Sequence, residues 1–347
     1  MMEMNERSEV LGLLGAEMRR VVDENDDAYI AVSNQAYLRN NWFTKAAVDQ
    51  SMIAWADALV PVSFTKWISR YKISNGFTEK KIGVINAGNI PLVGLHDMLS
   101  VFLCGHIYKG KNSSDDQLLL PFIASLLQKI NPSAGSRIFF ADRLEGFDAV
   151  IATGSNQSAR YFSSYFGKYP HIIRKNRNGV GVIAGEETSG ELETLGRDIF
   201  QYFGLGCRNI SKLYVPQDYN FVKFFESIFS WNDVMQHHKY MNNFDYNNAM
   251  LLMKLMPFLQ NGFLILREDE RIASPIAVIH YERYSDKKTL GQSLDSDEQL
   301  IQCVMSNHKL ALESQLKERV VKFGESQKPA LWDYADGVDT LAFLSAL

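Results

Sequence analysis

The chain has 347 residues, of which 46% are hydrophobic and 22% charged, as in a globular protein of about two domains. The formal net charge is −4 with both signs interspersed, so nucleic acid is not an expected partner. No apolar run approaches the ~20 residues that span a bilayer, the N-terminus lacks a signal-peptide pattern, and the three cysteines form no CxxC pair. We therefore expect a cytoplasmic protein without a membrane span, a disulfide framework or a metal site.

Helical periodicity covers residues 7–59, and from residue 81 short apolar strands alternate with helices. Strands are expected at 80–88, 106–111, 136–142 and 148–154, and helices at 91–105, 115–130 and 156–167. This β-α-β alternation predicts a parallel, doubly wound α/β sheet of Rossmann type behind a helical N-terminal segment.

The polar, basic stretch RKNRNG at 174–179 marks the expected boundary, which gives domains at 1–178 and 179–347. In the second domain, strands are expected at 180–185, 211–216, 262–269 and 274–282, and helices at 189–204 and over about 218–258.

Two turns of the first domain follow expected strands. Asn89 lies in NAGNIP, before a helix that Pro91 starts; its amide could donate to an oxyanion, or it is a turn or capping residue. Thr153, Gly154 and Ser155 form a TGS turn before a helix whose N-terminus suits a phosphate, although an ordinary capped βα turn has the same residues. In open α/β sheets, ligands bind at this carboxyl end of the strands.

Lys109 and Lys111 close the expected strand HIYKGK. Either could meet a nucleotide, or both are solvated surface lysines. His96 and Asp97 lie on the helix that follows Asn89. His96 could serve as an acid or base, whereas such a pair is more often a surface or helix-packing feature.

Cys207 lies in FGLGCRNISKLYVP, at a helix-to-strand joint behind two glycines. On a turn that substrate can reach, its thiolate would be a strong nucleophile; the other interpretation is a small buried hydrophobe. Cys104 and Cys303 lie inside apolar runs and fit simple packing.

The order AGNIPL, GHIYKGK, ATGS, FGLGC and IASPIAV resembles the aldehyde dehydrogenase superfamily. More closely, VINAGNIPLVGLHDMLSVFLCGH, IATGSNQSARYFSSYFGKYPHIIRKNR and FQYFGLGCRNISKLYVP are similar to the short bacterial acyl-CoA reductases, the family of the fatty acyl-CoA reductase component of bacterial luciferase systems. The resemblance covers roughly residues 80–285, and the closing DYADGVDTLAFLSAL is also similar. It implies an aldehyde dehydrogenase-like fold with a nucleotide-binding domain at 1–178, a catalytic domain at 179–347 and an active-site cleft between them.

The resemblance implies a role for each matching residue. Cys207 matches the catalytic cysteine that takes up the acyl group as a thioester, and Asn89 with the Cys207 N–H matches the oxyanion hole. Residues 153–155 match the turn against the cofactor pyrophosphate, and Lys111 matches the lysine that contacts the adenosine ribose. His96 is the candidate proton donor.

The chain departs from the family pattern in three places, one of which is Glu270, a position out of register with a ribose-contacting glutamate of the family. The other two bear on the reaction and the cofactor. Residues 173–176 align with the stretch that carries a water-activating glutamate in acid-forming members, and they contain none. This favours reduction of an acyl thioester, since water must not hydrolyse the intermediate. Ser114 replaces a glutamate that NAD-preferring members often carry, so NADPH is the expected cofactor, with Lys109 or Lys111 to pair with its 2′-phosphate; NADH is the alternative.

The sequence therefore predicts an NADPH-dependent acyl-CoA reductase that forms an aldehyde. Its expected partners are the acyl-CoA substrate and either further copies of the chain or an acyl-transfer protein. Two alternatives remain open: a CoA-acylating aldehyde dehydrogenase running in the opposite direction, and a non-catalytic acyl- or nucleotide-binding subunit.

Overall fold

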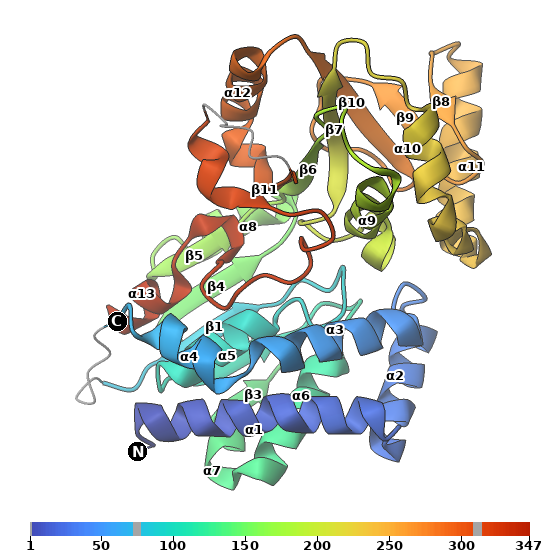
Figure 1. Cartoon of the computed structure of the whole chain (residues 1–347). Coiled ribbons are helices and arrows are strands. Elements are labelled where there is room, and N and C mark those ends of the chain that lie inside the picture. Colours follow the sequence, from blue (N-terminus) through green and yellow to red (C-terminus); the bar gives the residue numbers. More distant parts are fainter. Residues whose placement is uncertain (1, 72–77, 308–313) are drawn as a thin grey trace. The chain divides into compact units, whose positions relative to one another are not determined.

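The structure is a computed structural model that describes residues 2–71, 78–307 and 314–347. Its contacts divide the chain into two units: Met1–Asn176 with Pro329–Leu347 form unit 1, and Arg177–Lys328 form unit 2. Each unit has a β-sheet of its own with helices packed on it (Figure 1).

Unit 1 begins with four helices, α1 (Met4–Asp23), α2 (Asp27–Arg39), α3 (Lys45–Ala58) and α4 (Pro61–Ile68). The side chains of Asp26 and Thr44 cap α2 and α3 by accepting from main-chain N–H groups. At Gly15, α1 approaches the end of α3 so closely that a Cβ would lie 2.7 Å from the Cβ of Leu59. The helical N-terminal segment that the sequence predicts is confirmed.

Five parallel strands follow, in the order β3-β2-β1-β4-β5. The strands are β1 (Lys81–Ile85), β2 (Ile107–Lys111), β3 (Ile138–Phe140), β4 (Ala149–Thr153) and β5 (His171–Arg174), and the helices between them are α5 (Leu95–Leu103), α6 (Leu119–Ile130), α7 (Pro132–Gly135) and α8 (Asn156–Phe166). The chain moves outward from β1 to β3 and then returns to β4 on the other side of β1, which is the doubly wound order.

The C-terminal segment belongs to unit 1, where it adds the 3₁₀ turn η5 (Ala335–Gly337) and α13 (Thr340–Ser345). Leu331, Tyr334 and Leu341 enter the same core as α1, α3 and α5, and Trp67 Nε1 donates to the Tyr334 hydroxyl at 2.7 Å. The expected division at 178/179 assigned this segment to the second domain. The structure differs because the apolar side chains of the segment are buried in the first core.

Unit 2 contains a seven-stranded sheet in the order β12-β11-β6-β7-β10-β9-β8, parallel except that β8 is antiparallel to β9. Its strands are β6 (Asn178–Val182), β7 (Ile210–Pro216), β8 (Leu259–Gln260), β9 (Ile265–Glu268), β10 (Val278–Tyr284), β11 (Ile301–Met305) and β12 (Val320–Val321). Its helices are α9 (Ser189–Phe200), α10 (Val222–Ser227), α11 (His238–Met253) and α12 (Lys287–Ser296), with 3₁₀ turns η1 (Gln201–Gly204), η2 (Ile228–Gln236), η3 (Glu298–Leu300) and η4 (Gln315–Arg319).

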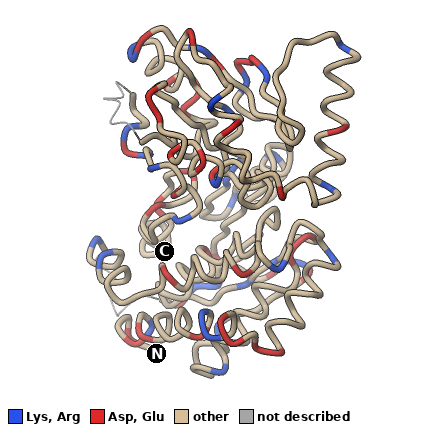
Figure 2. Tube along the Cα trace, turned by 45° about the vertical axis from the view of Figure 1, so that its right-hand side comes forward, with Lys and Arg blue, Asp and Glu red and all other residues tan. Residues whose placement is uncertain are grey.

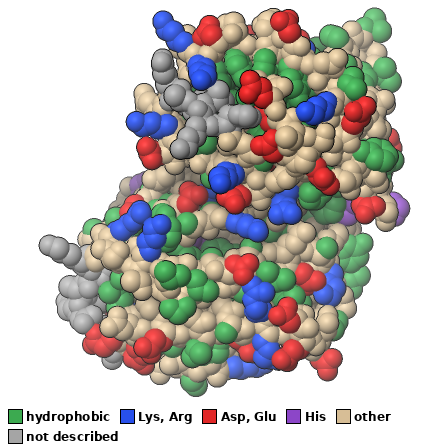
Figure 3. Space-filling view, viewed as in Figure 1, with side chains coloured by type: hydrophobic (Ala, Val, Ile, Leu, Met, Phe, Trp, Pro, Cys, Tyr) green, Lys and Arg blue, Asp and Glu red, His purple; other side chains and the backbone are tan. Residues whose placement is uncertain are grey.

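Charged residues of both signs are mixed along the chain trace (Figure 2), and their side chains are mixed over the face drawn in Figure 3. Within the described residues, no helix combines the length and the apolar content needed to cross a membrane.

Candidate active site

The loops that carry most of the predicted site residues share one edge of the unit 1 sheet. Strands β1, β2 and β4 end at Ile85, Lys111 and Thr153, and Ile85 pairs with Lys111 on one side and with Ala152 on the other. The order of the sheet reverses between β1 and β4, and open α/β sheets bind ligands outside the carboxyl ends of strands at such a switch point. The fold therefore brings Asn89, Lys111 and residues 153–155 to a single edge.

The loop from β1 to α5 contains a buried, hydrogen-bonded asparagine, Asn86, and an exposed one, Asn89. Asn86 is buried, and its Nδ2 donates to the Tyr108 hydroxyl at 2.7 Å and to Asn112 Oδ1 at 2.9 Å. A Cβ at Gly94 would collide with the Asn86 side chain, so α5 begins directly against this network. The loop is thus fixed by its neighbours, and the oxyanion role of Asn89 stays a prediction.

The turn Thr153-Gly154-Ser155 leads directly from β4 into α8. The Ser155 hydroxyl caps the helix by accepting from the Ser158 N–H at 3.1 Å. A Cβ at Gly154 would lie 2.9 Å from the Cβ of Ser158 and 3.0 Å from the Phe162 ring, so glycine lets the turn pass close to α8. Capping does not use all the N–H groups of the first helical turn, and those that remain are the donors that bind phosphates at helix N-termini.

A pocket of about 540 Å³ lies at the carboxyl ends of β2 and β3. Lys111 and Ser114 line it, and so does Arg39 from the last turn of α2, whose Nη1 donates to Gln117 Oε1 at 2.5 Å. Asp142 is the one carboxylate among the described lining residues. Sequence reasoning missed Arg39, because nothing in the pattern of α2 shows that this helix ends beside the pocket at the carboxyl ends of β2 and β3.

Lys109 does not line this pocket. Its Nζ donates to the carbonyl oxygens of Glu145 and Gly146 at 3.0 and 3.1 Å, which ties β2 to the loop between β3 and β4. Of the two lysines, Lys111 is the one placed to meet a ligand, and a cofactor contact for Lys109 stays a prediction.

These residues fit a dinucleotide. Gly154 clears space for a close approach to the main chain, and the N-terminus of α8 suits a pyrophosphate. Lys111, Ser114 and Arg39 would hold the adenosine ribose and a phosphate on it, since guanidinium and ammonium groups bind phosphate well.

His96 packs against the C-terminal segment of unit 1. Its Nε2 lies 2.8 Å from the carbonyl oxygen of Leu331, and its ring centroid is 5.4 Å from each of the Trp67 and Tyr334 rings. Because a carbonyl oxygen only accepts, Nε2 carries the proton in this contact. The geometry matches the packing interpretation of His96, and its role as a proton donor stays a prediction.

Arg174, the last residue of β5, forms a buried two-point ion pair with Asp97 of α5. Its Nη1 and Nη2 donate to the two carboxylate oxygens at 2.6 and 2.9 Å, and Nη2 also donates to the Thr340 hydroxyl of α13 at 2.8 Å. Arg174 lies within residues 173–176, where acid-forming aldehyde dehydrogenases carry their glutamate by the resemblance. A guanidinium stays protonated and cannot activate water as a base.

Cys207 lies in the turn between α9 and β7, after an uncommon stretch of backbone. Tyr202, Phe203 and Gly204 have positive φ angles of 53°, 57° and 77°. For a side chain other than glycine this conformation costs roughly 1 kcal/mol or more, and it persists only where the surroundings enforce it. The Cys207 side chain is partly exposed, as a nucleophile requires.

Asn209 holds this turn in place, and sequence reasoning did not identify it. The buried Asn209 donates through Nδ2 to the carbonyl oxygens of Asp198 and Gln201 at 2.9 and 2.8 Å, and its Oδ1 accepts from the Gly206 N–H at 2.8 Å. One side chain therefore connects the end of α9 to the residue before Cys207. The sequence did contain one indication of this role, since asparagine side chains in turns often form hydrogen bonds with the main chain.

The other two cysteines are buried. Burial raises the pKa of the Cys104 thiol to about 12, so this thiol stays protonated and inert. Cys303 Sγ contacts Met305 Sδ at 3.6 Å inside the sheet of unit 2. Both environments match packing roles and contrast with the accessible turn of Cys207.

No family model and no curated protein matches this sequence. Solved structures do match. Aldehyde dehydrogenase 21 from Physcomitrella patens, in complex with succinate, is 13% identical with a TM-score of 0.67, and the match covers 99% of this chain and 84% of that chain. The indole-3-acetaldehyde dehydrogenase of P. syringae, in complex with NAD+, is 12% identical with a TM-score of 0.65 over 92% and 76% of the two chains. An NADP-dependent enzyme of E. coli is 13% identical with a TM-score of 0.66 over 93% and 78%.

Identities this low establish the fold and nothing beyond it. The chain has the aldehyde dehydrogenase fold, with a Rossmann-like parallel sheet, a second mixed sheet and a helical N-terminus, so the predicted fold class is confirmed.

Proposed function

We propose that this protein is an NADPH-dependent acyl-CoA reductase that forms an aldehyde through a thioester on Cys207. The observation that carries the proposal is the buried Arg174–Asp97 pair at the end of β5, because residues 173–176 hold a paired guanidinium and no carboxylate that could activate water. A thioester protected from hydrolysis persists until it is reduced. The similarity to the luciferase-linked acyl-CoA reductases also supports reduction of a thioester rather than its hydrolysis.

In the proposed reaction, the Cys207 thiolate attacks the acyl carbonyl carbon and the bond from that carbon to the CoA sulfur breaks. The departing CoA thiolate takes up one proton. The Asn89 amide and the Cys207 main-chain N–H donate to the oxyanion in each tetrahedral state. NADPH, when bound, supplies a hydride to the acyl carbon. The oxyanion of the thiohemiacetal then collapses, which releases the aldehyde and returns the sulfur of Cys207 to the thiolate.

The proposed preference for NADPH over NADH rests on the pocket beside β2. Two cations, Arg39 and Lys111, line it together with Ser114, and a serine there does not repel a 2′-phosphate as a glutamate would. Ser114→Glu should lower the affinity for NADP+ roughly tenfold while leaving that for NAD+ little changed, measured by equilibrium binding. Lys129→Ala, an exposed lysine on α6, is the control. Equal effects on the two cofactors would contradict the assignment.

We also propose an assembly, either of several copies of the chain or with an acyl-transfer protein, in the cytoplasm. Sedimentation of the purified chain at several concentrations tests self-association.

The reaction is tested by following NADPH consumption with a panel of acyl-CoAs, using wild type, Cys207→Ala and the control Cys303→Ala. We expect oxidation that depends on acyl-CoA, yields an aldehyde and disappears only in Cys207→Ala. Faster turnover of aldehyde with CoA and NADP+ would instead indicate a CoA-acylating dehydrogenase. Binding without turnover, with Cys207 inert toward thiol reagents, would indicate a binding subunit.

A further inference from the structure

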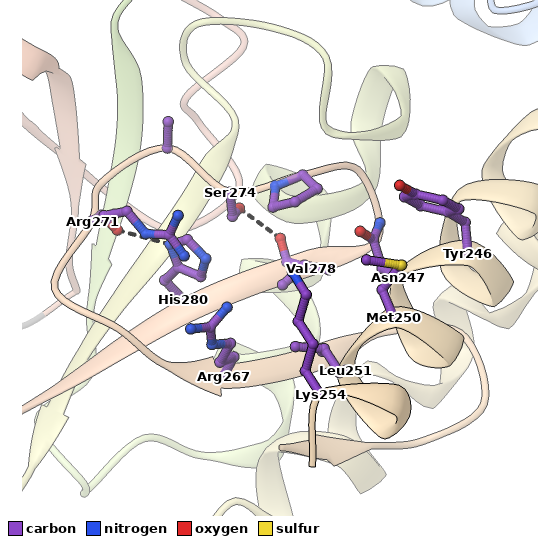
Figure 4. Close-up of a pocket in the computed structure, with 12 residues that line it drawn as sticks. Tyr246, Asn247, Met250, Leu251, Lys254, Arg267, Arg271, Ser274, Val278 and His280 are labelled. Carbon is purple, nitrogen blue, oxygen red and sulfur yellow. Dashed lines mark hydrogen bonds between the residues drawn. The ribbon is translucent and has the colours of Figure 1, made fainter. Parts of the chain in front are cut away.

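Unit 2 contains a second pocket, of about 430 Å³, between α11 and the strands β9 and β10. Figure 4 shows Arg267 and His280 on the strand side and Tyr246, Asn247 and Met250 on the helix side. A water molecule occupies about 30 Å³ of liquid, and ligand sites for small molecules begin near 300 Å³. The pocket is therefore large for an inorganic ion and suits a small organic molecule.

The charged side chains that line the pocket are cationic. Lys254, Arg267 and Arg271 line it, and no carboxylate does among the described residues. Asp269 does not line the pocket. It pairs with Arg267 at 3.1 Å and with Arg271 at 2.6 Å, and the hydrogen bonds from Arg271 hold the pKa of this carboxyl far below its usual range. One carboxylate thus offsets part of three positive charges, and an anion in the pocket would offset the rest.

Lys254 follows the last residue of α11, and its ammonium group has no ion pair or hydrogen bond within the described part of the chain. Its side chain lines the pocket (Figure 4), and it can reach a phosphate or carboxylate there without breaking an existing contact.

The pocket also holds two hydrogen-bond acceptors. His280 is only 2% exposed, and its Nδ1 lies 2.9 Å from the carbonyl oxygen of Arg271, so Nδ1 carries the proton and Nε2 is an acceptor. Burial also lowers the pKa of His280, which keeps the ring neutral. Nε2 has no protein partner in the residues that the structure describes. Asn247 donates through Nδ2 to the carbonyl oxygens of Asn243 and Ile276, which leaves Oδ1 to accept.

A third feature is apolar. Met250 and Leu251 of α11 and Val278 of β10 line the pocket, and the ring of Tyr246 is exposed beside them. These side chains offer contact to a flat or apolar group rather than to a hydrated ion.

We propose that this pocket binds a nucleotide that carries a phosphate monoester. The cations receive the phosphate, His280 Nε2 and Asn247 Oδ1 accept from hydroxyl or amino groups, and Tyr246 with Met250 contacts the base. Free nucleotides and the 3′-phosphoadenosine end of CoA share this chemistry. None of the residues that line this pocket also lines the cofactor pocket of unit 1, and the proposal does not depend on the proposed reaction.

The test is calorimetric titration of the full chain, with NADP+ present to occupy the cofactor pocket. The probes are adenosine 3′,5′-bisphosphate, AMP, adenosine and inorganic phosphate. We expect Lys254→Ala to lower the affinity for the tighter-binding of the two nucleotides, the bisphosphate or AMP, roughly tenfold. The loss of one charged hydrogen bond has an effect of this size. The matched control is Lys288→Ala, an exposed lysine on α12, and it should bind as wild type does. A preference for the bisphosphate assigns the site to CoA, and a preference for AMP assigns it to free nucleotides.

Three results would overturn the proposal. The first is unchanged affinity in Lys254→Ala, and the second is a nucleotide that binds no more tightly than phosphate or adenosine. The third is affinity that is lost in Lys111→Ala and retained in Lys254→Ala, which would locate binding in the cofactor pocket. Because Lys254 also caps α11, the Tm of each variant is measured, and Tyr246→Ala gives an independent test through the apolar contact.

Discussion

Asp116 shows how the surroundings of one residue set its chemistry. It is buried in the segment between β2 and α6, and its Oδ1 accepts from the Leu119 N–H at the start of α6 at 3.1 Å. Burial raises its pKa from 3.8 to about 6. The folded protein therefore binds this proton more tightly than the unfolded chain does, and the resulting stability is present at low pH and lost as the pH rises through about 6.

We expect this carboxyl to lower the free energy of unfolding by about 2 kcal/mol between pH 4 and pH 7. Asp116→Asn should remove that part of the pH dependence, whereas Asp115→Asn, at an exposed neighbour, should leave it intact. Urea unfolding at a series of pH values measures both. If the free energy of unfolding depends on pH in the same way in wild type and Asp116→Asn, Asp116 is not the source of the pH dependence.

At the level of single residues, the sequence revealed those whose signal is local. The position of Cys207 and of residues 153–155 in turns could be predicted because glycines and turn-forming residues lie next to them in the sequence, whereas their roles stay predictions. Arg39 and the Arg174–Asp97 pair could not, since each acts through a partner from a distant part of the chain.

Among the elements, α8 depends on one glycine for its position. A Cβ at Gly154 would press on Ser158 and Phe162, so Gly154→Ala should shift the first turn of α8 away from β4. We expect the affinity for NADP+ to fall roughly tenfold, because the N–H groups of that turn would no longer meet the pyrophosphate.

Equilibrium binding of NADP+ measures this effect. Gly12→Ala is the matched control in the same unit, since nothing lies within 4 Å of a Cβ placed there. If Gly154→Ala binds NADP+ as tightly as Gly12→Ala does, the turn is not a phosphate site.

Two of the strands that the sequence analysis missed are short and lie at sheet edges. β5 has four residues and ends the unit 1 sheet, and β12 has two residues at one end of the other sheet. Such strands form by pairing with a neighbour rather than through a pattern of their own. The long helices and the strands that lead into glycine turns were predicted because their periodicity is local.

For the whole molecule, the least predictable feature is the return of the C-terminal segment to unit 1. Two hydrogen bonds hold the segment in unit 1: Trp67 donates to the Tyr334 hydroxyl, and Arg174 donates to the Thr340 hydroxyl. Both join parts of the chain that are far apart in the sequence. No local pattern encodes such a pairing, so the sequence suggested the two-domain plan but not which core the segment completes.

Thr340→Val should lower the free energy of unfolding of unit 1 by about 1–3 kcal/mol, because it leaves a buried guanidinium N–H of Arg174 without its acceptor. Thr65→Val, at an exposed threonine of α4, should have little effect. Tryptophan fluorescence during denaturant unfolding reports mainly on unit 1, which contains Trp42, Trp55, Trp67 and Trp332. If Thr340→Val and Thr65→Val are equally stable, the hydrogen bond from Arg174 to Thr340 does not stabilise the position of α13.

The central claim is that Cys207 carries the acyl group. The most direct measurement is the intact mass of the protein after incubation with an acyl-CoA in the absence of NADPH, followed by addition of NADPH. We predict a mass increase of one acyl group that maps to Cys207, is absent in Cys207→Ala but present in Cys104→Ala, and disappears with release of aldehyde when NADPH is added. No acyl adduct, or an adduct that NADPH does not remove, would contradict the account.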